Sequence, residues 1–240
     1  MRGLSDGELT GHSGASQWSV AQVLSHLGSG AEISLATLRA AVASTPGPGQ
    51  DVTQDVWNRW NALTPREQAA AFLAFDEELV TALEALPAEQ RQTLRIELAF
   101  LPSPLPLAAY AGMRLNEAAQ HGWDVRVALH PGAAISAETA ALLAEHFAED
   151  LSFLIGFTGK ADALAQPAVI DIHGSGFALV IADTVSVTTS ASLPTATFTG
   201  PLEAAIRLLA GRLTTQHTPG DVEVTGNVTL DDLRWVFPGY

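Results

Sequence analysis

The stretch Arg114-Leu-Asn-Glu117-Ala-Ala-Gln-His121-Gly-Trp123-Asp124 decides how this chain is interpreted. It lies in a segment whose apolar spacing predicts a helix from about residue 108 to residue 129. Glu117 and His121 are four residues apart, so their side chains project from one helix face with Cβ atoms roughly 5–6 Å apart. A carboxylate and an imidazole at that spacing can hold one metal ion.

A third ligand is expected from His26, which lies in the segment Trp18-Ser-Val-Ala-Gln-Val-Leu-Ser-His26. This histidine belongs to a second predicted helix, Val20 to Val42, and a helical bundle brings facing side chains of different helices together. Three protein ligands leave one coordination position open, as in a catalytic zinc site. Without His26, the pair of Glu117 and His121 would fit a solvated ion pair on a helix surface equally well.

Two neighbours of these residues are candidates for supporting roles. Arg114 lies one turn before Glu117 and is expected either to orient its carboxylate or to hold an anionic substrate; a plain ion pair with Glu117 is the alternative. Asp124 lies three residues after His121 and is expected to accept the ring N–H that faces away from a metal.

The pattern along the chain predicts an α+β protein of two domains. Residues 1–155 are expected to form a helical bundle and residues 160–240 a small α+β domain, with the boundary near 155–165. The predicted helices of the first part span residues 20–42, 65–86, 88–99, 108–129 and 137–153. In the second part, strands are expected at residues 169–173, 177–182, 184–190, 195–199 and 222–225, and helical segments at residues 202–209 and 230–235.

Composition limits the classes of function. A formal net charge of −14 argues against nucleic acid or an anionic membrane as the main partner. No apolar run approaches the roughly 20 residues that span a bilayer, so we expect a soluble, cytoplasmic protein. The chain has no cysteine, so any thiol chemistry requires an external thiol. Lys160 is the only lysine, and this arginine bias is typical of a high-GC genome such as an actinobacterial one.

The two blocks at residues 18–26 and 114–124 together resemble those of the mycothiol-dependent maleylpyruvate isomerase family. That resemblance implies an N-terminal DinB-like four-helix bundle that carries one metal ion on His26, Glu117 and His121. It also implies that a first bundle helix, ahead of Gly3, is missing here. The segments Thr199-Gly-Pro201 and Leu208-Leu-Ala-Gly-Arg212 are similar to the family's small C-terminal domain, which is related to sterol carrier proteins.

The resemblance also implies a chemistry. Mycothiol, a low-molecular-weight thiol, would bind at the open metal position as its thiolate, which adds to an activated double bond or displaces a leaving group. Arg212 is then expected to help hold an anionic group, with a plain helix-terminal charge as the alternative. The substrate would be a small molecule, and the sequence leaves its identity and the oligomeric state open.

Three functions therefore stand as hypotheses. The first is a metal-dependent isomerase or thiol transferase that uses mycothiol. The second is a metal-dependent hydrolase in which water takes the open position. The third is a non-catalytic lipid or small-molecule carrier, in which the sterol-carrier-like domain would supply an apolar pocket.

Overall fold

The computed structural model describes residues 3–190 and 192–239. The chain forms two compact units, Met1–Pro131 and Gly132–Tyr240. The first is helical and the second combines a mixed sheet with helices, so the predicted α+β fold class is confirmed.

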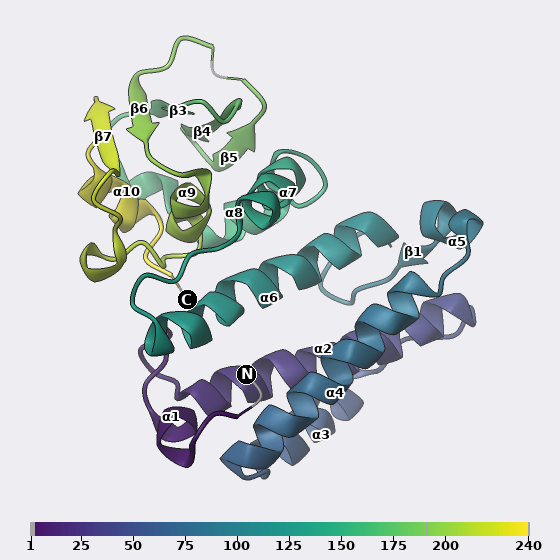
Figure 1. Cartoon of the computed structure of the whole chain (residues 1–240). Coiled ribbons are helices and arrows are strands. Elements are labelled where there is room, and N and C mark those ends of the chain that lie inside the picture. Colours follow the sequence, from purple (N-terminus) through teal and green to yellow (C-terminus); the bar gives the residue numbers. More distant parts are fainter. Residues whose placement is uncertain (1–2, 191, 240) are drawn as a thin grey trace. The chain divides into compact units, whose positions relative to one another are not determined.

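Long helices that run alongside one another make up most of the first unit (Figure 1). Its elements are α1 (Asp6–Thr10), α2 (Val20–Val42), α3 (Gln50–Asn61), α4 (Pro65–Glu84), α5 (Ala88–Thr93), β1 (Arg95–Ile96), β2 (Leu105–Pro106) and α6 (Leu107–Leu129). Helix α2 packs against α3, α4 and α6 and is therefore the central helix of this unit.

Local sequence signals explain where these helices begin. Ser19 caps α2 and Thr64 caps α4, and each forms a capping box with the Gln or Glu at the third helical position. Pro65 supplies the fixed φ that suits the first turn of α4. The apolar residues of α2 then contribute to two clusters, one around Leu24 and Trp60 and one around Leu35 and Leu79. His26 lies between two residues of the first cluster, Leu24 and Leu27, and Gly30 directly precedes Ala31 of the second.

The second unit is built on a five-stranded sheet. Its elements are α7 (Ala137–Ala148), α8 (Ser152–Thr158), β3 (Ala168–Ile172), β4 (Phe177–Ile181), β5 (Val185–Thr188), β6 (Ala196–Thr199), α9 (Leu202–Leu209), β7 (Glu223–Gly226) and α10 (Leu230–Val236), with short 3-10 turns η1 (Ala161–Ala163) and η2 (Thr215–His217). The strand order is β5-β4-β3-β6-β7. Strands β3 and β6 are parallel, and the other neighbours are antiparallel.

The contacts divide the chain at residues 131–132 and not at the expected 155–165. Helix α7 packs on α9 and β5, and α8 packs on β5, so both helices belong to the second unit. The buried stripe of α7, which includes Leu143 and Phe147, is covered there. Helical periodicity reveals that such a stripe must be covered, but it does not reveal which elements cover it.

Candidate metal centre

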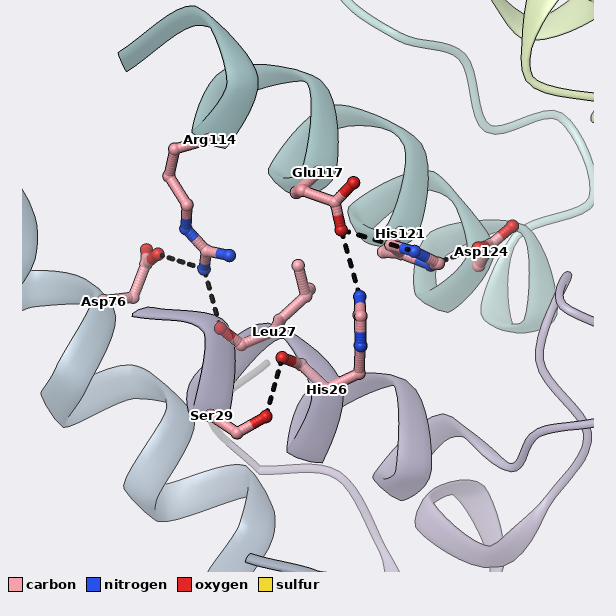
Figure 2. Close-up of polar contacts among 8 residues, drawn as sticks. All are labelled: His26, Leu27, Ser29, Asp76, Arg114, Glu117, His121 and Asp124. Carbon is pink, nitrogen blue, oxygen red and sulfur yellow. Dashed lines mark hydrogen bonds and ion pairs between the residues drawn. The ribbon is translucent and has the colours of Figure 1, made fainter. Parts of the chain in front are cut away.

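Three potential metal ligands from two helices lie together in the first unit (Figure 2). His26 projects from α2, and Glu117 and His121 project from α6. Glu117 Oε2 lies 3.0 Å from His26 Nε2 and 3.7 Å from His121 Nε2. One ligand atom from each residue can be chosen so that all three lie within 4.8 Å of one another.

These distances suit a shared ion. Zinc–ligand bonds of about 2.1 Å in tetrahedral geometry place neighbouring ligand atoms about 3.4 Å apart. Two of the observed separations bracket that value, so small side-chain rotations would complete the arrangement. Neutral imidazole and carboxylate are also the ligand types that zinc and other divalent first-row metals accept. The residues therefore fit the ion that the sequence leads us to expect.

Asp124 fixes the orientation of His121. Its Oδ2 lies 2.9 Å from His121 Nδ1, and its side chain is fully buried. A carboxylate at this position accepts a hydrogen bond from Nδ1–H, which holds the proton on Nδ1 and leaves the Nε2 lone pair on the side of Glu117. The hydrogen bond expected from the i,i+3 spacing is present, and the role of Asp124 in metal binding belongs to the proposal below.

The aromatic ring of Trp18 covers the histidines. Its centroid lies 5.1 Å from that of His26 and 5.9 Å from that of His121, with which it is stacked at 23°. The loop that carries Trp18 is anchored on α6, because the backbone N–H of Gly14 donates to the carbonyl of Asp124 at 2.8 Å. A Cβ at Gly14 would lie 2.9 Å from the Asp124 Cα, so this approach requires glycine.

The electrostatics of the site favour an ionised Glu117. Burial would raise the pKa of this carboxyl group, but the hydrogen bond with His26 and the electrostatic interactions with His121, His26 and Arg114 outweigh that effect. Its pKa therefore lies below the ordinary value. A carboxylate that stays charged is the form that binds a cation.

Arg114 lies beside this group, with a partner that the sequence did not identify. Its Nη2 donates to the carbonyl of Leu27 at 2.8 Å and to Asp76 Oδ1 at 3.2 Å (Figure 2). Its Nε is buried and has no hydrogen-bond partner in the part of the chain that the structure describes. Among those residues Arg114 forms its ion pair with Asp76 of α4 and not with Glu117, so the alternative of a plain ion pair with Glu117 is not observed.

The sequence does contain a signal for Asp76. It lies four residues after Phe72 and three before Leu79, both of which are buried on α4. A carboxylate at that spacing projects from the buried face and requires a cation or a donor. That signal would have directed attention to Arg114.

Arg212 belongs to the second unit, where it follows α9. Its Nη1 donates to the carbonyl of Ala210 at 3.0 Å. In the same unit, Arg207 is buried and donates from Nε and Nη2 to the carboxylate of Glu203 at 2.8 and 2.9 Å. This buried pair ties the turns of α9 together and was not predicted.

The candidate metal site opens into a cavity of about 420 Å³ within the first unit. His26, Glu117 and Arg114 line it, together with residues of α3 and of the segment 97–100. The side chains of His26 and Glu117 are 39% and 36% exposed, whereas that of His121 is 6% exposed. A small molecule in the cavity would therefore reach the site from the side of His26 and Glu117.

Fold and site together define a helical bundle with a candidate His-Glu-His metal centre, joined in one chain to an α+β unit. The family model described as the mycothiol maleylpyruvate isomerase N-terminal domain matches residues 1–126. The chain therefore belongs to the mycothiol-dependent maleylpyruvate isomerase family, as its two sequence blocks predicted.

Solved structures agree with this fold over almost the whole chain. The crystal structure of a mycothiol-dependent maleylpyruvate isomerase matches with a TM-score of 0.63 and 14% sequence identity, covering 94% of this chain and 85% of that one. The structure of a histidine-to-alanine mutant of that isomerase matches with a TM-score of 0.62 and 16% identity, over the same shares of both chains. At such identities the likeness establishes the fold alone.

A search among curated proteins and a search for membrane-spanning helices both gave negative results. No curated protein sequence matches the chain significantly. Within residues 3–190 and 192–239, none of the helices combines the length and the apolar character needed to cross a membrane.

Proposed function

We propose that this protein is a metal-dependent enzyme that uses mycothiol for isomerase or thiol-transferase chemistry on a small molecule. The observation that carries the proposal is the convergence of His26, Glu117 and His121 within 4.8 Å in a member of this family. The relatives of known structure are named as mycothiol-dependent maleylpyruvate isomerases, which supports the same class of reaction.

The proposed roles follow from the contacts. His26, Glu117 and His121 would hold a divalent ion, and we assign zinc because the donor set is two imidazoles and one carboxylate. Asp124 would keep His121 in the tautomer that binds through Nε2. Arg114 and Arg212 would hold anionic groups of the thiol or the substrate, Arg114 through the part of its guanidinium that Asp76 and Leu27 do not occupy.

The loaded site would supply a thiolate at neutral pH, a nucleophile that adds to an activated double bond or displaces a leaving group. The chain's own part is to position that sulfur and to shield it from water. Trp18 covers the histidine rings on one side, and the cavity beside Glu117 and Arg114 receives the electrophile. The absence of cysteine fits this division, because the sulfur arrives with the cofactor.

The cellular setting is part of the same proposal. We place the enzyme in the cytoplasm of a mycothiol-producing actinobacterium, without nucleic acid or membrane as a partner. The net charge of −14 supports this by disfavouring both polyanionic surfaces.

Cobalt substitution tests the proposal directly. A cobalt-loaded protein should develop a sulfur-to-metal charge-transfer band when mycothiol is added, and the His121→Ala variant should develop none. A spectrum that mycothiol leaves unchanged, combined with metal-dependent cleavage of ester or amide probes, would contradict the thiol assignment and favour a hydrolase. Lipid that co-purifies with a protein indifferent to chelators would favour a carrier.

A further inference from the structure

The walls of the cavity beside the candidate metal site are largely apolar. Helix α2 contributes Ile33, α3 contributes Trp57, and α6 contributes Tyr110 and Met113. The segment that follows β1 adds Leu98 and Phe100. The cavity thus has a polar end at His26, Glu117 and Arg114 and an apolar body.

Two hydroxyl groups along the apolar walls, those of Tyr110 and Thr37, already have partners within the protein. The hydroxyl of Tyr110 donates to the carbonyl of Ser34 at 2.9 Å, and that of Thr37 donates to the carbonyl of Ile33 at 2.9 Å. These donors are used in tying α6 to α2 and in closing a turn of α2. A ligand would therefore meet mainly ring and methyl surfaces away from the polar end.

The charges of the lining disfavour a ligand with two negative groups. The lining contains two carboxylates, Glu97 and Glu117, and one guanidinium, Arg114, and the ion proposed above would add positive charge only at the end where Glu117 lies. Asp76 already pairs with that guanidinium. A single anionic group can lie at the polar end beside Arg114, whereas a second one farther along the cavity would meet apolar walls and Glu97.

Gly30 keeps space open beside Arg114. A Cβ at this position would lie 3.2 Å from Arg114 Nη1, so any larger residue would crowd the guanidinium. The Nε of the same guanidinium is buried and has no partner among the described residues.

From these features we infer that the electrophile bound here has an aromatic or branched apolar body and at most one negative charge, in contrast to a short dicarboxylate. That the bound molecule reacts as an electrophile rests on the proposed function. The binding preference itself depends only on the cavity, which is present whether or not the protein uses a thiol. It narrows the substrate class within the family. The reacting carbon would lie near the polar end, and the apolar body would extend between Trp57 and Phe100.

Ligand binding tests this inference independently of catalysis. Isothermal titration calorimetry of the zinc-treated full chain would compare trans-cinnamate, a phenyl ring with one carboxylate, with maleate, a short dicarboxylate. We expect cinnamate to bind at least ten times more tightly than maleate. A repeat after treatment with a chelator should preserve the order, because the apolar walls do not depend on the metal.

Variants at the rim of the cavity provide the structural control. Trp57 and Phe100 are 44% and 62% exposed, so truncation should leave the fold intact. Trp57→Ala and Phe100→Ala should each weaken cinnamate binding about fivefold, the usual scale of an aromatic contact. Trp235→Ala and Phe157→Ala remove rings that are 72% and 73% exposed on the second unit, and they should change it less than twofold.

Several outcomes would overturn the inference. Maleate binding as tightly as cinnamate would refute the apolar preference, and so would the absence of cinnamate binding. Cinnamate binding that ignores Trp57 and Phe100 would place the ligand elsewhere. A different result would contradict the proposed function alone. In that case cinnamate would bind as expected, but mycothiol would leave the spectrum of the cobalt-loaded protein unchanged.

Discussion

Removing the carboxylate of Asp124 should weaken metal binding without removing a ligand. Asp124 is fully buried and its Oδ2 lies 2.9 Å from His121 Nδ1. Partners of this kind typically contribute 10- to 100-fold to metal affinity. Asp124→Asn keeps an acceptor of the same shape but loses the charge, so we expect about a tenfold loss, or about 1.4 kcal/mol. Asp124→Ala leaves Nδ1–H without this acceptor and should cost about 100-fold.

Competition with a chromogenic chelator measures these affinities. Glu203→Gln is the matched control, because Glu203 is also a buried carboxylate and its loss leaves Arg207 incompletely paired in the second unit. This control should lower stability while zinc affinity stays within twofold of wild type. Folded Asp124 variants that bind zinc like wild type would show that Asp124 does not support His121 as a ligand. An equal loss in Glu203→Gln would attribute the effect to general destabilisation.

Further predictions concern packing, charge and pH. Gly28→Ala should destabilise the protein by about 1–3 kcal/mol in chemical denaturation, because its Cβ would lie 2.1 Å from the ring of buried Trp60. Asp76→Ala should cost about 1–2 kcal/mol, because Arg114, whose side chain is 12% exposed, loses a partner. Hydrogen bonds from the backbone N–H and hydroxyl of the helix cap lower the pKa of Asp232. The stability that this charge contributes is present above the unfolded-state pKa of about 3.9 and is lost as pH falls through the lower folded value. Asp232→Asn should therefore lower the melting temperature at pH 7 and make little difference below pH 3.

Matched variants separate these effects from general sensitivity to mutation. Gly7→Ala introduces a Cβ that meets nothing within 4 Å, so it should be neutral or slightly stabilising. Glu78→Ala breaks a surface ion pair with Arg39 and should cost less than about 1 kcal/mol. If Gly28→Ala and Gly7→Ala were equally stable, α2 and α3 would be able to move apart at Gly28 without loss of folding free energy. Equal effects at Asp76 and Glu78 would show that the Arg114 pair is only a surface interaction.

The sequence predicted the helices that carry the site well, because their signals are local. Helix α2 has the predicted bounds, Val20–Val42, since Ser19 caps its start and Pro46 follows soon after its end. Helix α9 also has its predicted bounds. The i,i+4 and i,i+3 spacings placed Glu117, His121 and Asp124 on one face, and that geometry follows from helix periodicity alone.

Other features depend on long-range packing and were missed. Helix α3 was not predicted because its sequence is largely polar and it buries only Val56 and Trp60. The predicted helix over residues 88–99 ends at Thr93, because the chain there enters strand β1. The pairing of Arg114 with Asp76 joins positions 38 residues apart on two helices, which no local pattern specifies. The assignment of α7 to the second unit is likewise a matter of packing.

Whether His26, Glu117 and His121 bind a metal ion is measured by the metal content per chain, determined by elemental analysis after zinc loading and desalting. We expect about one ion per wild-type chain and a loss of that ion in His26→Ala, Glu117→Gln and His121→Ala. His173→Ala, which alters a histidine on the second unit, should retain it. A wild-type protein that remains metal-free, or ligand variants that keep their zinc, would contradict the proposed metal centre.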